Sequence, residues 1–285
     1  MISEAELRRR AAALGADPML VDLDYVLGCV LSQWYLRPDA GHYRLKGGTC
    51  LRKCYFPEYR FSEDLDFSAE RTVSISDVER LVRDAIQKVQ EVFGIDFGVQ
   101  PPMFRIAEER PGWASYEARA YYRGPLRRTG APRAIRVDIS LGEFLALPAA
   151  GRRLNHPYSD KNLFADTLIP CYALEETLVE KARALCGQRR FAISRDLYDI
   201  YQLTGLPQVE LERIRPFVGN KLVARGITPE QVDPCAFTRR RAEFRRDWED
   251  NLHPLLPASD TTSFDKAWQA GVKIVSWVSS VVSGG

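Results

Sequence analysis

The residue types that could carry chemistry are concentrated between positions 45 and 68, in the run LKGGTCLRKCYFPEYRFSEDLDFS. Asp64 and Asp66 lie two apart in a stretch that alternates between polar and apolar residues. Residues i and i+2 of a β-strand point to the same face, so we expect the two carboxylates to converge. Adjacent carboxylates repel unless a cation lies between them, and Mg²⁺ binds one or two carboxylates together with substrate phosphates. The alternative is a solvated pair on a surface strand.

A glycine pair precedes these carboxylates in Lys46-Gly47-Gly48-Thr49, where a strand is expected to run into a helix. Glycine lets the backbone approach a ligand closely, and a helix N-terminus suits phosphate. A purely structural turn is the other interpretation.

A third carboxylate, Asp138, interrupts the apolar strand pattern AIRVDISL at residues 134–141. A charged residue in such a strand needs a partner, a metal or an exposed face. Arg60 and Ser62 lie just upstream of the first two carboxylates, where an arginine suits a phosphate or a carboxylate. A phosphate-binding turn with three aspartates predicts nucleotidyl transfer assisted by two Mg²⁺ ions.

The pattern K-G-G-T-x-L followed by R-x-S-x-D-x-D resembles the DNA polymerase β-like nucleotidyltransferase superfamily. Within it, the sequence is most similar to the AbiEii/AbiGii toxins of type IV toxin–antitoxin and abortive-infection loci, which include the MenT-type toxins. Two later runs are similar to helical motifs of that family. These are YALEETLVEKARAL at residues 172–185, with Lys181, and ISRDLYDIYQL at residues 193–203, with Arg195, Asp196 and Asp199.

The resemblance implies a role for each matching residue. The implied catalytic residues are Asp64, Asp66, Asp138, Lys181, Asp196 and Asp199, of which Asp64, Asp66 and Asp138 hold the metal. The implied nucleotide-binding residues are Lys46, Gly47, Gly48, Thr49, Arg60, Ser62 and Arg195. The cofactor is Mg²⁺, with Mn²⁺ as a substitute, and an NTP is the substrate. From the residues alone, Lys181 would ordinarily be a solvated charge, and only the family pattern indicates a function for it. Arg195 and Asp196 could equally form a structural ion-pair lattice.

The resemblance further implies transfer of an NMP from the NTP to an RNA acceptor, a tRNA 3′ end, which blocks translation. Arginine clusters at 123–136 and 239–246 are candidate phosphate contacts or solvated surfaces. Protein nucleotidylylation, with AMP or UMP placed on Ser, Thr or Tyr, and a non-catalytic nucleotide-binding regulator are the alternatives. A cognate antitoxin is an expected partner.

The elements that must position these residues follow from periodicity and capping. We expect an α+β protein whose N-terminal half is a polymerase β-like mixed sheet flanked by helices and whose C-terminal half is all helical. The expected domains are 1–155 and 156–285. The predicted helices span 4–14, 18–36, 49–55, 76–93 (capped by Ser76 and Glu79), 172–185 and 194–203. The predicted strands span 43–45, 65–68, 95–99, 115–122 and 134–141.

Composition is that of a globular protein, with 45% hydrophobic residues, 27% charged residues and a net charge of +2 among 285 residues. We expect a cytoplasmic protein with no membrane segment, because no window approaches about 18 apolar residues. The six cysteines are scattered without a C-x-x-C pair, which favours small buried residues over a zinc site or a disulfide framework.

Overall fold

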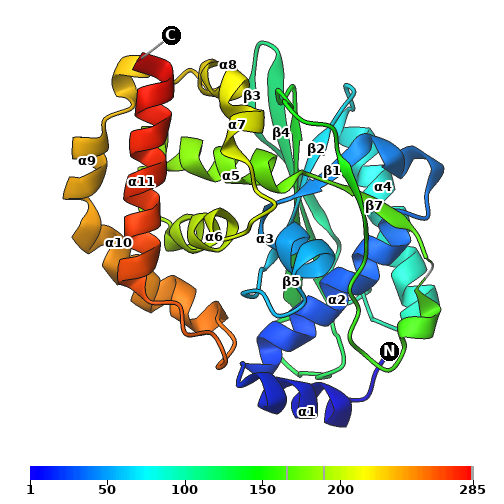
Figure 1. The fold of residues 1–285 in the computed structure, drawn as a ribbon. Helices are drawn as coiled ribbons and strands as arrows, with labels where there is room; N and C mark the ends of the chain where they lie inside the picture. Colours follow the sequence, from blue (N-terminus) through cyan, green and yellow to red (C-terminus); the bar gives the residue numbers. More distant parts are fainter. Residues whose placement is uncertain (165, 189, 284–285) are drawn as a thin grey trace. The chain divides into compact units, whose positions relative to one another are not determined.

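A mixed sheet organises the first part of the chain in the computed structural model, which describes residues 1–164, 166–188 and 190–283 (Figure 1). Its strand order is β3-β4-β5-β2-β1-β7-β6, with parallel pairing at β2–β5 and β1–β7 and antiparallel pairing elsewhere. The strands are β1 (Tyr43–Lys46), β2 (Asp64–Ala69), β3 (Met103–Arg110), β4 (Trp113–Tyr122), β5 (Arg133–Leu141), β6 (Ala150–Arg153) and β7 (Leu168–Cys171).

Helices cover the apolar face of this sheet. They are α1 (Glu4–Leu14), α2 (Pro18–Trp34) and α4 (Ile75–Phe93), and α4 packs against α2, β3 and β4. Trp34 at the end of α2 stacks on Phe67 of β2, with ring centroids 4.6 Å apart. Alternation along β2 therefore leaves its aspartates on the opposite face of the sheet from the helices.

Two compact units make up the chain. Unit 1, which contains the whole sheet, comprises Met1–Glu143, Ala149–Cys171 and Leu255–Ser259, and unit 2 comprises Phe144–Pro148, Tyr172–Pro254 and Asp260–Gly285. The division differs from the expected ranges 1–155 and 156–285, because β7 completes the sheet of unit 1.

Every named element that the structure places wholly in unit 2 is helical. The α-helices are α5 (Leu174–Arg183), α6 (Ser194–Thr204), α7 (Leu211–Ile214), α8 (Val218–Val223), α9 (Pro234–Arg239), α10 (Arg241–Asp247) and α11 (Phe264–Ser283). Gly271 lets α11 approach α6 closely, since a Cβ there would lie 2.4 Å from Cδ2 of Leu197. Across the described residues, no helix is both long and apolar enough to span a bilayer.

Three sequence-based expectations about elements are wrong. Residues 95–99 form only an isolated bridge between Asp96 and Arg123. The helix expected from position 76 begins at Ile75, and its capping box pairs Ser74 with Asp77 instead of Ser76 with Glu79.

The third error is an omission, because strands β3, β6 and β7 were not expected. β3 is an edge strand in which Met103 is 56% and Ile106 50% exposed and, of its described side chains, only Phe104 packs against the core, so it lacks the half-buried alternation that marks a strand.

Candidate nucleotidyltransfer site

The three sequence-predicted metal ligands lie on one polar face of the sheet. β2 and β5 run parallel with Asp66 opposite Asp138 and Asp64 opposite Arg136. Neighbouring strands are about 4.8 Å apart, so these side chains are adjacent. The residues between them, such as Leu65 and Val137, are buried on the other face. The expected convergence of the carboxylates therefore follows from register as well as from alternation.

Arg136 binds two of the three carboxylates. Its Nη2 lies 2.7 Å from Oδ2 of Asp64, and its Nε lies 2.9 Å from Oδ2 of Asp138. Burial, together with the negative charge of Asp66, raises the pKa of Asp138 to about 6 although Arg136 opposes the shift. One guanidinium thus compensates the negative charge of this face only in part.

The glycine pair packs directly against this face. Gly47 has φ +74°, and a Cβ there would lie 2.3 Å from Oδ2 of Asp66. A Cβ on Gly48 would lie 2.7 Å from Nη2 of Arg60 and 2.8 Å from Oγ of Ser62. Both positions therefore require glycine, and they bring the turn beside the carboxylates and beside Arg60 and Ser62, which are themselves buried.

Thr49 has a structural contact in this arrangement. It belongs to the short helix α3 (Gly47–Cys50), which continues as the π-helical turn η2 (Leu51–Tyr55). Its Oγ1 donates a hydrogen bond of 2.5 Å to the carbonyl oxygen of Asp64. The hydroxyl therefore fixes the start of β2 relative to the turn.

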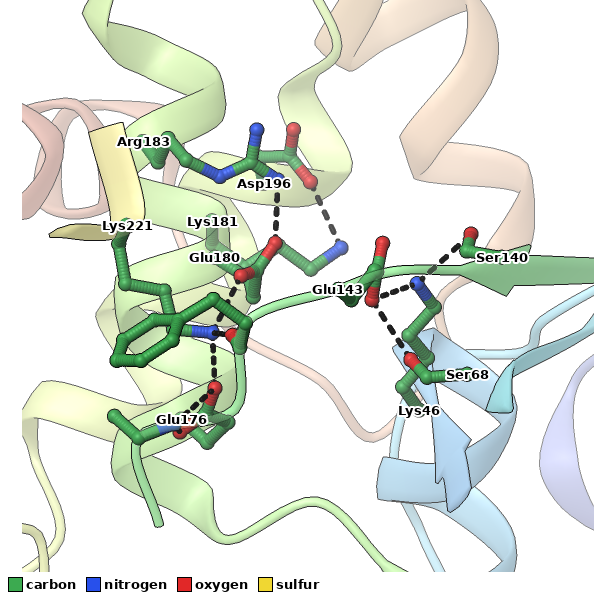
Figure 2. A network of polar contacts seen from close by, with 12 residues as sticks. Lys46, Ser68, Ser140, Glu143, Glu176, Glu180, Lys181, Arg183, Asp196 and Lys221 are labelled. Carbon is green, nitrogen blue, oxygen red and sulfur yellow. Dashed lines mark hydrogen bonds and ion pairs between the residues drawn. The ribbon is translucent and has the colours of Figure 1, made fainter. Parts of the chain in front are cut away.

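Sequence reasoning missed Glu143, which shares this face with Lys46. Figure 2 shows the Lys46 ammonium directed at Glu143, at 2.7 Å, and at Ser140 Oγ, at 3.3 Å. Ser68 donates a 2.7 Å hydrogen bond to the same carboxylate oxygen. The only sequence signal was an acidic residue two positions after the end of β5, which is too common to single out.

The face fits a divalent cation by its chemistry. Oxygen ligands are those that Mg²⁺ prefers, and the pKa of Asp138 is raised first by burial and then by the negative charge of Asp66, which a cation would offset. Across the described residues, no group of three or more His, Cys, Asp or Glu side chains is already arranged as metal ligands. Two of the carboxylates bind Arg136 instead, so a cation would have to compete with that guanidinium.

The helical motif residues lie in unit 2 and form an ion-pair cluster there. Nζ of Lys181 on α5 lies 2.8 Å from Oδ1 of Asp196 and 3.0 Å from Oδ2 of Asp199, both on α6. The two aspartates share a helix face, as their spacing predicts, and both are buried. Arg195 is half-buried on the same helix.

A second buried cluster in unit 2 has Lys221 at its centre (Figure 2). Its ammonium pairs with Glu176 and with Glu180 on α5 and donates to the carbonyl oxygen of Phe144 at 2.6 Å. Glu176 in turn accepts a 3.0 Å hydrogen bond from the amide of Leu147. These contacts hold residues 144–148 within unit 2, a role that the sequence did not suggest.

Unit 2 also carries a cationic groove that sequence reasoning missed. A cavity of about 470 Å³ lies between α11, the end of α6 and Leu211. Lys266 and Lys273 line it together with Tyr201 and Trp277, and no carboxylate of a described residue does so. Lys266 and Lys273 are seven positions apart, which places them on one helix face.

The two arginine clusters differ in the structure. In the cluster at 239–246, four arginines pair with nearby carboxylates; Arg241 and Arg245, for example, both bind Asp265, at 2.6 and 2.8 Å. In the cluster at 123–136, the loop residues Arg127 and Arg128 are exposed. The contacts favour a structural surface for the later cluster. In the earlier cluster Arg133 and Arg136 also pair with carboxylates, which leaves Arg127 and Arg128 as its candidates for binding phosphate.

Comparison with known proteins places these features in a family. The profile described as "Nucleotidyl transferase AbiEii toxin, Type IV TA system" matches residues 29–270. The fold is similar to that of MenT4, a nucleotidyltransferase toxin of Mycobacterium tuberculosis H37Rv, with a TM-score of 0.56, 20% identity and 99% of each chain covered. It is also similar to JHP933 from Helicobacter pylori, with a TM-score of 0.50, 15% identity, and 94% of this chain and 95% of that chain covered.

A search of curated proteins finds no matching sequence. The structural likenesses confirm the expected α+β nucleotidyltransferase fold with a helical C-terminal region. The family match confirms the type of activity predicted from the glycine pair and the aspartates. The chain therefore belongs to the AbiEii family of nucleotidyltransferase toxins of type IV toxin–antitoxin systems.

Proposed function

We propose that this nucleotidyltransferase moves an NMP from an NTP to an RNA acceptor, a tRNA 3′ end, and thereby blocks translation. The observation that carries the proposal is the placement of Asp64, Asp66 and Asp138 on one polar face, with the Gly47 turn packed against Asp66. Phosphoryl-group transfer needs charge stabilisation and positioning more than covalent help from the protein. A carboxylate face that holds a cation would supply the charge stabilisation, and the tight glycine turn beside it would supply the positioning.

Each predicted site residue of unit 1 has a role in this proposal. Asp64, Asp66 and Asp138 hold Mg²⁺, or Mn²⁺ in its place, and the bound cation supplies charge compensation for the triphosphate and the leaving pyrophosphate. Gly47 and Gly48 let the backbone approach the phosphates. Lys46, Arg60 and Ser62 bind and orient the nucleotide, and Thr49 positions β2 through the carbonyl of Asp64.

In unit 2 we assign Lys181, Arg195, Asp196 and Asp199 to the same activity on the strength of the family motif. The ion pairs of Lys181 with both aspartates fix its ammonium group. A Lys181→Met variant separates a catalytic role from a purely structural one. Both roles predict a lower melting temperature, because the change leaves Asp196 and Asp199 buried without the counter-charge of Lys181. Only a catalytic role also predicts loss of transfer per folded molecule below that temperature.

The cationic groove supports a nucleic-acid acceptor. Lysine side chains bind backbone phosphates, and aromatic side chains such as Tyr201 and Trp277 stack on bases. A Lys266→Ala/Lys273→Ala variant is expected to raise the KM for RNA several-fold and to leave kcat unchanged. An unchanged KM at low salt would remove the groove from the proposal.

The direct test incubates the purified protein with each α-³²P-labelled NTP, Mg²⁺, and cellular RNA and protein, with Asp64→Ala alongside. Glu91→Gln, an exposed carboxylate change on α4, is the matched control. We expect an RNase-sensitive label of tRNA size that is absent in Asp64→Ala. Periodate-oxidised tRNA, whose terminal ribose has lost its hydroxyls, should remain unlabelled. Protease-sensitive label alone would indicate protein nucleotidylylation, and no label with any NTP would favour a nucleotide-binding regulator.

The family also gives the proposal a cellular setting. Membership of a type IV toxin–antitoxin family leads us to propose a cognate antitoxin as partner and the cytoplasm as the place of action. Expression of the protein alone should arrest growth, and co-expression of a cognate antitoxin should relieve the arrest. Arrest by Asp64→Ala at equal protein levels would contradict a catalytic toxin.

A further inference from the structure

Three of the six cysteines meet in unit 1. Cys50 ends α3, Cys54 lies four residues later in η2, and Cys171 ends β7. The Cys54 thiol is in hydrogen-bonding contact with both Cys171 and Cys50. The sequence predicted only small buried residues here, because these cysteines are separated by up to 121 positions and form no recognised spacing.

The three thiols differ in exposure and in acidity. Cys50 and Cys171 are buried, whereas Cys54 is half-buried. Hydrogen bonds from Cys171 and Cys50, together with the positive charges of Lys53 and Arg152, hold the pKa of Cys54 below its ordinary value. Burial raises the pKa of Cys50. The cluster therefore places one half-buried cysteine, whose pKa is lowered, beside two buried cysteines whose pKa values are raised.

We propose that Cys54 and Cys171 form an oxidation site in which a peroxide converts the two thiols to a disulfide. The Cys54 thiolate attacks one peroxide oxygen, so that an S–O bond forms, the O–O bond breaks and hydroxide leaves. The Cys171 sulfur then attacks the Cys54 sulfenic acid, so that the S–S bond forms, the S–O bond breaks and water leaves. In total, two thiols are oxidised and one hydrogen peroxide is reduced to two waters.

Cys171 is the resolving thiol because it lies on a different element. β7 pairs with β1 through Cys171 and Leu45, so Cys171 lies beside the strand that leads into the glycine pair. Cys50 lies one helical turn from Cys54 on the same short helix, where a disulfide would have to distort the helix itself. A bond to Cys171 instead ties η2 to the sheet.

The disulfide would act on the nucleotide-binding turn. α3 and η2 are consecutive, so movement of Cys54 toward β7 strains the helix that begins at Gly47. Gly47 has little space to adjust, since even a Cβ added to it would lie 2.3 Å from Oδ2 of Asp66. Resting on the proposed transferase function, this argument predicts that oxidation lowers nucleotide transfer at least tenfold and that dithiothreitol restores it.

The test treats the full-length protein with substoichiometric to tenfold hydrogen peroxide and maps disulfides by mass spectrometry of peptides digested without reduction. We expect the Cys54–Cys171 linkage before any change at Cys235, which is exposed but apart from the cluster. Cys54→Ser should abolish the linkage, and Cys171→Ser should leave Cys54 as a sulfenic acid that dimedone traps. Cys235→Ser should leave both the linkage and the oxidative loss of transfer unchanged.

The mapping does not depend on any activity, so it tests the site even if the chain transfers nothing. Peroxide that modifies Cys235 while Cys54 and Cys171 remain as thiols would overturn the oxidation site. A Cys54–Cys50 linkage would overturn the assignment of Cys171. A Cys54–Cys171 linkage that leaves the transfer rate unchanged would overturn the effect on the nucleotide-binding turn.

Discussion

Two groups of charged residues in unit 1 differ in how deeply their carboxylates are buried and how fully they are paired with positive charges. One is the polar face of Asp64, Asp66, Asp138 and Arg136. The other, which we call the Asp24 cluster, consists of Asp24 on α2 with Arg52, Lys53 and Tyr158. Asp24 accepts hydrogen bonds of 2.7 Å from Arg52, 2.6 Å from Lys53 and 3.0 Å from Tyr158. Its side chain is 3% exposed, whereas that of Asp138 is 31% exposed.

The pKa values of Asp24 and Asp138 reflect this difference in pairing. Burial works against ionisation of Asp24, but the charges of Lys53 and Arg52 hold its pKa well below the usual range. Burial and the charge of Asp66 raise the pKa of Asp138 to about 6. Charge compensation is complete in the Asp24 cluster and incomplete on the polar face, so we assign the first to stability and propose the second as the cation site. Arg52 and Lys53 come directly after the glycine motif, yet their contacts assign them to stability.

The largest expected effect is on catalysis at the polar face. Asp66→Asn removes one of the proposed ligands, and we expect transfer to fall by about 10³-fold or more, since metal assistance accounts for several kcal/mol of the barrier. Stability should be unchanged or slightly higher, because a charge repulsion with Asp138 is removed. Rates from labelled NTP and melting temperatures test both parts. Retained activity would remove Asp66 from the site.

The complementary change breaks the Asp24 cluster. Asp24→Asn leaves Lys53 and Arg52 buried without their counter-charge, and we expect the free energy of unfolding to fall by about 3–5 kcal/mol. Urea unfolding at pH 7 measures the loss. Activity per folded molecule should remain near that of the wild type, and a loss comparable to that of Asp66→Asn in a fully folded sample would contradict the comparison.

The Asp24 cluster also predicts acid sensitivity with a definite sign. Because the folded-state pKa of Asp24 is depressed, its contribution is fully present above the unfolded value of about 3.9 and is lost as the pH falls below it. The stability difference between wild type and Asp24→Asn should therefore shrink between about pH 5 and pH 2. A stability difference between the two proteins that grows as the pH falls would contradict a depressed pKa of Asp24.

Part of this comparison could be predicted from the sequence. Asp64, Asp66 and Asp138 were predicted because alternation in a strand fixes the face of a side chain. The partners Arg136 and Glu143 were not predicted. Strand register decides which residues lie opposite each other, and the local sequence pattern does not encode register. Asp24 was visible only as an anomaly in an apolar helix, since its partners lie 28 to 134 positions away.

A smaller effect is expected at the glycine turn. Gly47→Ala places a Cβ 2.3 Å from the Asp66 carboxylate at a positive φ, so we expect about 1–3 kcal/mol of destabilisation and a transfer rate reduced by about tenfold to a hundredfold. Gly41→Ala, where a Cβ meets nothing within 4 Å, is the matched control. Equal behaviour of the two variants would show that the turn does not need glycine.

The smallest expected effect concerns Arg136 as a competing cation. Arg136→Met removes the guanidinium that binds Asp64 and Asp138, so a divalent cation no longer has to displace it. We expect Mn²⁺ to bind several-fold more tightly and the unliganded protein to lose about 1 kcal/mol of stability. Calorimetric titration measures the first quantity. Weaker Mn²⁺ binding would show that Arg136 supports the cation site.

The most direct measurement of the central claim counts bound Mn²⁺ by electron paramagnetic resonance, with and without each NTP, in wild type, Asp66→Asn and Asp24→Asn. If the polar face is the metal site, wild type and the folded fraction of Asp24→Asn will bind Mn²⁺ in the presence of an NTP, and Asp66→Asn will lose that binding. Equal Mn²⁺ binding by wild type and Asp66→Asn would contradict the account, because the cation would then lie elsewhere.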